Sequence, residues 1–78
     1  MKTYKIGERY QVKRLSADID QHFRQKLLSM GFIPGAIIHI MRVAPLGDPL
    51  QVEIKGCQLS IRRRDLEKLA LEKVSDDN

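Results

Sequence analysis

The chain has 78 residues, of which 14 are Lys or Arg and 10 are Asp or Glu, giving a formal net charge of +4. So short a chain builds one small core, and we expect a single domain over residues 1–78. The lone Cys57 excludes a disulfide framework and a multi-cysteine metal site within one copy. No apolar run could span a membrane and no signal-peptide core is present, which predicts a cytoplasmic protein.

The chain begins with a predicted lead-in, a strand and the start of a helix. Residues 1–7 are expected to form a loose lead-in with a turn. Residues 10–15 alternate apolar and polar side chains, a pattern typical of a strand. After this strand, Asp18 or Asp20 can accept the unpaired N–H groups of a helix start. Asp18 and Gln21 also have the spacing of a capping box.

A helix over residues 20–30 is predicted, together with the residues that end it. Its apolar side chains recur every three or four positions and share one face: Ile19, Phe23, Leu27 and Met30. Gly31 stands where a left-handed residue closes the last helical turn, and Phe32 is expected to fold back onto Leu27. Pro34 and Gly35 fit the middle of a type II turn, in which glycine supplies the positive φ.

The second half of the chain predicts mainly strands. Residues 36–43 are apolar and β-branched, so this strand is expected to be buried at least in part on both faces. Pro45, Gly47 and Pro49 end the strand and brace the loop over 44–49, since proline lacks the N–H that a sheet ladder needs. The elements that follow are strands over 50–55 and 58–62, a helical turn over 64–67, a last strand over 69–74 and a frayed tail over 75–78.

These elements indicate the fold class. Five short strands around one thin core, with turns at regular intervals, are typical of a small barrel. The sequence therefore predicts a mainly β fold: an SH3-like five-stranded barrel with one inserted α-helix and a short helical turn before the last strand. A small α+β sandwich is the competing fold.

Side chains that could carry chemistry are few, and their spacing does not indicate an enzyme. His22, His39 and Cys57 could in principle hold a metal ion, but none has ligand-pair spacing such as HxxxH or CxxC. No metal site and no cofactor are therefore predicted. The Arg62-Arg63-Arg64 run could bind phosphate. The four aromatic residues are too few for the stacking platform that single-strand binders use, so no nucleic-acid partner is predicted.

Three motifs at fixed separation carry a family resemblance. They are LLSMGFIPG over residues 27–35, RVAPLGDP over 42–49 and LxIRxxDL over 59–66. Together they resemble the FeoA family, small cytoplasmic proteins of the bacterial ferrous iron uptake system. The resemblance covers residues 10–74.

The resemblance implies both a fold and a partner. The implied fold is an SH3-like barrel with an inserted helix, which agrees with the predicted order of elements. The implied partner is FeoB, a membrane ferrous iron transporter with a cytoplasmic GTP-binding domain. The chain is then a non-enzymatic accessory or regulatory protein that docks on this cytoplasmic GTPase part and reaches the membrane through its partner only. No catalytic residue carries over from the family, and weak self-association is left open.

A contact surface can be predicted from the apolar residues that a small barrel has no room to bury, because exposed apolar patches mark interaction sites. The predicted contact residues lie on the helix, at its end and on the proline-braced loop: Arg24, Leu28, Met30, Phe32, Leu46 and Asp48. For Leu28 and Met30, packing in the core is an equal alternative. The residues with architectural roles in turns are Gly31, Pro34, Gly35, Pro45, Gly47 and Pro49.

Three alternative functions remain open from the sequence. The first is a metal-sensing or iron-delivery module that uses His22, His39 and Cys57. The second is a small nucleic-acid-binding barrel that uses the arginine run over 62–64. The third is a GTPase-activating protein that supplies Arg24 or Arg42 as an arginine finger.

Overall fold

The strands and helices form in the predicted order, each within one residue of its expected ends. The computed structural model describes residues 3–75, so of the predicted tail only Ser75 lies within the described residues. The elements are β1 (Arg9–Leu15), α1 (Gln21–Ser29), β2 (Ile37–Val43), η1 (Pro45–Gly47), β3 (Leu50–Ile54), β4 (Cys57–Ile61), α2 (Arg63–Leu66) and β5 (Leu69–Lys73). No helix within residues 3–75 has the length and apolar character needed to cross a bilayer.

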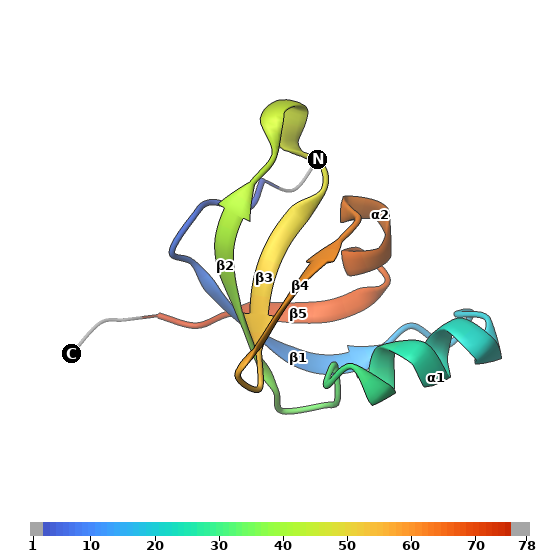
Figure 1. The fold of residues 1–78 in the computed structure, drawn as a ribbon. Helices are drawn as coiled ribbons and strands as arrows, with labels where there is room; N and C mark the ends of the chain where they lie inside the picture. Colours follow the sequence, from blue (N-terminus) through green and yellow to red (C-terminus); the bar gives the residue numbers. More distant parts are fainter. Residues whose placement is uncertain (1–2, 76–78) are drawn as a thin grey trace.

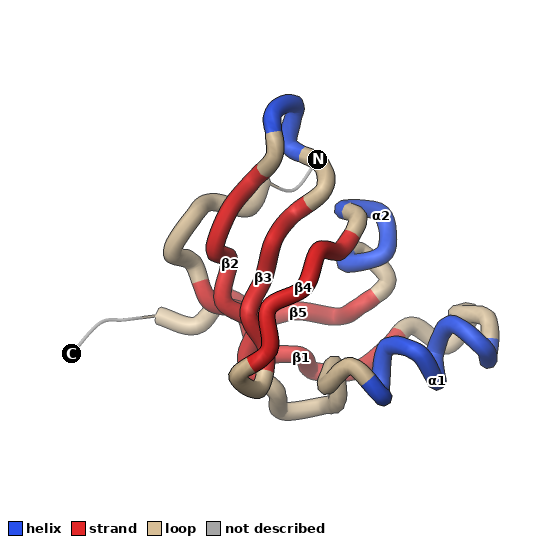
Figure 2. Tube along the Cα trace, in the orientation of Figure 1, coloured by secondary structure: helices blue, strands red, loops and turns tan. Residues whose placement is uncertain are grey.

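The five strands make one antiparallel sheet in the order β4-β3-β2-β1-β5. This sheet curls strongly: in Figures 1 and 2, β2, β3 and β4 stand upright side by side while β1 and β5 cross behind them. The core fills the space enclosed by the curl, and β3 shows the pattern well, with Leu50, Val52 and Ile54 buried and the residues between them half-buried. The mainly β architecture with an inserted helix and a helical turn before the last strand is confirmed.

The two faces of β2 are buried to different extents. Ile38 and Ile40 point into the core and are fully buried. Ile37 and Met41, on the opposite face, are 40% and 36% exposed. Because the sheet curls around one core, each strand has only one inner face, and the apolar run of β2 continues on the outside. The prediction that this strand is buried at least in part on both faces is therefore confirmed, with the inner face fully buried and the outer face only partly.

The two ends of α1 are fixed by local hydrogen bonds. Asp20 is the N-cap residue, and its carboxylate accepts the backbone N–H of Phe23 at 3.2 Å. Asp18 instead accepts the hydroxyl of Ser16, so a capping box based on Asp18 is wrong. At the other end, the Phe32 N–H donates to the Leu27 carbonyl at 3.0 Å, which is the long bond of a Schellman motif.

The N-terminal segment is tied to the sheet rather than loose, contrary to expectation. Tyr4 is buried and meets Tyr10 edge to face, with 5.3 Å between ring centroids. Glu8 joins this segment to two strands. Its carboxylate accepts the backbone N–H of Lys5 at 2.9 Å and the hydroxyl of Tyr10 at 2.7 Å. It also pairs with Lys73 of β5 at 2.9 Å.

Glu8→Gln is expected to weaken the fold at neutral pH and to flatten its response to acid. The hydrogen bonds from Lys73, Tyr10 and the Lys5 backbone lower the pKa of Glu8 from 4.5 to about 2. A carboxyl whose pKa is lower in the folded state stabilises the fold above its unfolded pKa, and this stabilisation is lost as the pH falls. The loss should extend from about pH 4.5 down to pH 2 in the wild type.

Urea unfolding at a series of pH values measures this effect. Glu72→Gln is the matched control, since Glu72 is an exposed carboxylate paired with Lys13 at 3.3 Å. The control should keep the acid response of the wild type. If Glu8→Gln also kept that response, the carboxylate of Glu8 would not carry the predicted pH dependence.

Candidate functional site

The predicted contact residues do not form one surface. Arg24 and Leu28 lie on α1, and Met30 is its C-cap residue. Leu46 and Asp48 lie in the η1 loop, and Figure 1 shows that this loop and α1 project from opposite ends of the molecule. A contact that uses both sets must therefore span the molecule or engage them separately.

Phe32 has to be removed from the predicted contact residues. Its side chain is 0% exposed and belongs to the same core cluster as Leu27. The Schellman motif causes this, because it turns the chain back at Gly31 (φ +104) and directs the next residue into the core. The expectation that Phe32 meets a partner is wrong for the folded chain.

The η1 loop is a rigid tip that presents one apolar side chain. Leu46 is fully exposed and has a positive φ of 70°. The loop is closed by two backbone hydrogen bonds, from Gly47 N–H to the Ala44 carbonyl at 2.8 Å and from Ala44 N–H to the Pro49 carbonyl at 3.1 Å. These bonds hold Leu46 in place without burying it.

Arg63 fastens the η1 loop to α2. Its guanidinium Nη2 donates to the Gly47 carbonyl at 2.9 Å, and its backbone N–H donates to the Asp48 carboxylate at 2.8 Å. The same guanidinium lies over the Tyr4 ring, 5.6 Å from the centroid. Asp48 therefore has a structural task at the start of α2 in addition to its predicted role as a contact residue.

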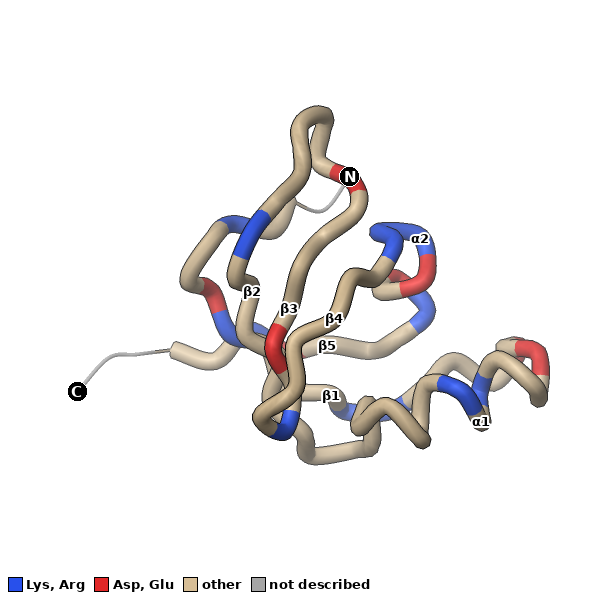
Figure 3. Tube along the Cα trace, viewed as in Figure 1, with Lys and Arg blue, Asp and Glu red and all other residues tan. Residues whose placement is uncertain are grey.

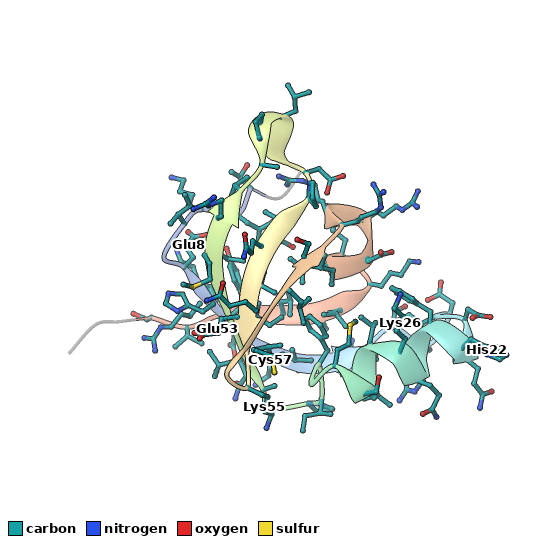
Figure 4. All side chains as sticks on the ribbon, viewed as in Figure 1. Glu8, His22, Lys26, Glu53, Lys55 and Cys57 are labelled. Atoms are coloured by element: carbon teal, nitrogen blue, oxygen red, sulfur yellow. The ribbon has the colours of Figure 1, made fainter. Side chains whose placement is uncertain are left out.

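A groove of about 280 Å³ separates α1 from β4 and the start of α2. One wall comes from α1 and its cap, and the other from β4 and α2. The lining residues are Phe23, Lys26, Leu27, Met30, Ser60, Ile61, Arg62 and Asp65. The groove thus combines apolar with polar and charged lining residues, and Lys26 is labelled on α1 in Figure 4.

Sequence reasoning missed this groove although it identified the residues of one wall. The spacing of Phe23, Leu27 and Met30 predicted that they share one apolar face of the helix. In the structure Leu27 alone of the three is fully buried, and the other two are half-buried at the groove. The partner wall is formed by residues 60–65, which are distant in sequence, so no local pattern could have indicated it.

The alternative sites are not assembled by the described residues. Within residues 3–75, no three His, Cys, Asp or Glu side chains come together as a metal site. Figure 4 shows His22 on α1 and Cys57 at the start of β4, well apart. Of the three arginines at 62–64, Arg63 is bound to the η1 loop. The basic residues are scattered over several elements in Figure 3 and do not form a single stripe.

Comparisons with known proteins show which family and which relatives this chain is similar to. The family model described as "FeoA domain" matches residues 1–73. A protein of Porphyromonas gingivalis, named as a fusion of Fe(2+) transport protein A and Fe(2+) transporter FeoB, is 38% identical over 55 residues. That alignment covers 70% of this chain and 6% of the fusion protein, so the chain corresponds to a small part of that relative.

Solved structures agree with the family model. The solution structure of iron(II) transport protein A from Clostridium thermocellum has a TM-score of 0.82 and 35% identity, covering 91% of this chain and 43% of that one. The crystal structure of Stenotrophomonas maltophilia FeoA, described as a prokaryotic SH3 domain protein, has a TM-score of 0.74 and 15% identity. It covers 90% of this chain and 85% of that one and supports the fold alone. The fold is therefore SH3-like, as the sequence predicted, and the chain belongs to the FeoA family.

Proposed function

We propose that this protein is a non-enzymatic accessory protein of ferrous iron uptake that docks in the cytoplasm on the GTPase part of a FeoB-like transporter. The observation that carries the proposal is the relative from P. gingivalis, whose name joins transport protein A and transporter FeoB in one polypeptide. When one organism joins two proteins in a single polypeptide, the separate forms of these proteins in another organism are expected to bind each other.

The shape of the η1 loop supports docking. Leu46 is an exposed large apolar side chain on a loop that is already ordered by its own hydrogen bonds and by Arg63. Binding through an ordered loop loses little conformational entropy, and a protruding apolar side chain can fill a pocket of the partner. Arg24, Leu28 and Met30 on and after α1 would supply a second contact.

Leu46→Asp should weaken binding to the cytoplasmic part of the transporter by about tenfold or more, because a charge would replace the apolar anchor. Aspartate tolerates a positive φ, so the loop should keep its shape. Isothermal titration with the purified cytoplasmic part measures the affinity. Ile6→Asp, which places the same charge on another exposed apolar residue, is the matched control and should bind as the wild type does.

The α1 contact is tested separately. Arg24→Glu changes only an exposed side chain, whereas Leu28→Glu with Met30→Glu changes residues that also pack against the core. Circular dichroism must therefore show that the double variant is folded before its affinity is compared. Wild-type affinity in all of these variants would contradict the proposed surfaces. Absence of binding by the wild type would contradict the proposed function itself.

A further inference from the structure

β4 is an edge strand without the usual protection against further pairing. Among the described strands it is hydrogen-bonded to β3 alone. Its sequence, CQLSI, contains neither a charged residue nor a proline. The strand at the other edge, β5, contains Glu72 and Lys73. Because natural edge strands are commonly blunted by charges, prolines or bulges, β4 is the edge of this sheet that is suited to accept another strand.

The turn before β4 determines which of its backbone groups face outward. Lys55 and Gly56 have φ values of 54° and 80°, as a two-residue type I′ hairpin turn requires. Ile54 and Cys57 flank this turn as a register pair. In such a hairpin the flanking pair exchanges both hydrogen bonds, and bonded and non-bonded pairs then alternate along the ladder.

This alternation leaves Gln58 and Ser60 with outward-facing N–H and C=O groups. Leu59 pairs with Val52 two positions after the bonded pair at the turn, so its own groups face β3. Outside the sheet ladder, the backbone hydrogen bonds of residues 3–75 include none from Gln58 or Ser60. Both residues are also exposed. The free edge therefore offers two donors and two acceptors, spaced as an added strand needs.

The groove provides room for such a strand. Ser60 lines the groove directly, opposite Phe23 and Met30. Phe23 of α1 and Met30 at its C-cap form an apolar wall beside this edge, and Figure 1 shows α1 lying at an angle to β4, so an added strand would meet this wall over part of its length. Alternate side chains of an added strand would face the apolar wall. The SH3-type alternative, a polyproline segment, needs a groove lined by several aromatic residues, and Phe23 is the single aromatic residue among the described residues that line this groove.

Charges at the rim indicate the chemistry of the segment. Asp65 is paired with Lys68 at 3.6 Å. Lys26 and Arg62 both line the groove, and among the ion pairs of residues 3–75 neither has a carboxylate partner. An acidic side chain in the added strand would satisfy them, at the rim where charge complementarity favours the correct partner.

We propose that the groove binds an extended segment of the transporter's cytoplasmic part, with apolar residues at alternate positions and at least one acidic residue, which pairs with β4 as a sixth strand. This inference rests on the proposed docking function and states how the docking takes place. Main-chain hydrogen bonds to Gln58 and Ser60 supply affinity, while the apolar wall and the basic rim supply specificity.

Amide hydrogen exchange followed by NMR tests the proposal with the full chain and the cytoplasmic part of the transporter. In the free protein the amides of Gln58 and Ser60 should exchange quickly and that of Leu59 slowly. Binding should slow exchange at Gln58 and Ser60 by about tenfold or more and leave Leu59 slow. Binding with unchanged exchange at both amides would overturn this inference alone. Absence of binding would instead overturn the proposed function.

Two variant pairs give an independent result. Ser60→Pro removes one outward N–H and should weaken binding by about tenfold, whereas Ser60→Ala keeps that N–H and should bind as the wild type does. Lys26→Glu with Arg62→Glu should also weaken binding, and Lys5→Glu with Arg14→Glu, an equal charge change at exposed residues that do not line the groove, should not. The proposal would be overturned if Ser60→Pro bound as tightly as Ser60→Ala and the groove charge variant bound as tightly as its control. Amide protection that depends on the protein's own concentration would also overturn it, since that would assign the edge to a second copy.

Discussion

Phe32→Ala is expected to lower the free energy of unfolding by about 3–5 kcal/mol, the cost of removing a buried aromatic side chain and leaving a cavity. Phe32 is 0% exposed and is among the largest fully buried side chains of the core. Small domains have a total stability of only several kcal/mol. We therefore expect the variant to be largely unfolded under conditions in which the wild type is folded.

Urea unfolding followed by circular dichroism measures this loss. Ile33→Ala is the matched control, because Ile33 is the next residue in the chain and is 37% exposed. Its truncation should cost about 1 kcal/mol or less. If Phe32→Ala were as stable as the wild type but no longer bound the transporter, Phe32 would be a contact residue after all and the core assignment would fail.

The local features of this fold could be predicted from the sequence because each rests on residues close together in the chain. The Schellman motif after α1 involves only the six residues from Leu27 to Phe32. The turn at Pro34 and Gly35 closes with the Ala36 N–H donating to the Ile33 carbonyl at 3.0 Å. Residues 50–55 alternate apolar and polar side chains, and β3 buries the apolar ones.

The candidate site could be predicted only in part because it depends on contacts between distant segments. Residues 60–65, on the opposite side of the groove, determine which apolar side chains of α1 stay accessible. Leu46 was identified correctly as an apolar residue of the loop, but its separation from α1 follows from the curl of the sheet. Asp48 looked like a surface charge, and its bond to the Arg63 backbone joins positions 15 residues apart.

Gly31→Ala is expected to destabilise the protein by about 1–3 kcal/mol through backbone strain alone, and by more through crowding. The φ of Gly31 is +104°, which residues with a side chain rarely adopt. A Cβ at this position would lie 3.2 Å from Cγ of Lys55 in the β3–β4 turn. This contact is closer than ordinary van der Waals contact, so the Lys55 side chain would have to shift by a few tenths of an ångström.

Gly35→Ala separates the cost of backbone strain from the cost of steric crowding. Gly35 has a similar φ of +93°, but a Cβ there would meet nothing within 4 Å. The Gly31 variant should therefore be the less stable of the two in urea unfolding. Replacing Lys55 by glycine should remove the difference, since it deletes the crowded atoms and suits the positive φ of 54° at that position. An unchanged difference in the Lys55→Gly background would show that crowding is absent.

Gly31→Ala also tests whether the packing of α1 against the β3–β4 hairpin affects the groove. Gly31 follows the C-cap of α1, and a Cβ there would meet Ile54 and Lys55 of the β3–β4 hairpin. A bulkier residue should push the two walls of the groove apart. If the added strand is held by both the edge of β4 and the apolar wall of α1, Gly31→Ala should weaken transporter binding in the fraction that remains folded, and Gly35→Ala should not. Equal affinities would mean that the width of the groove does not matter for docking.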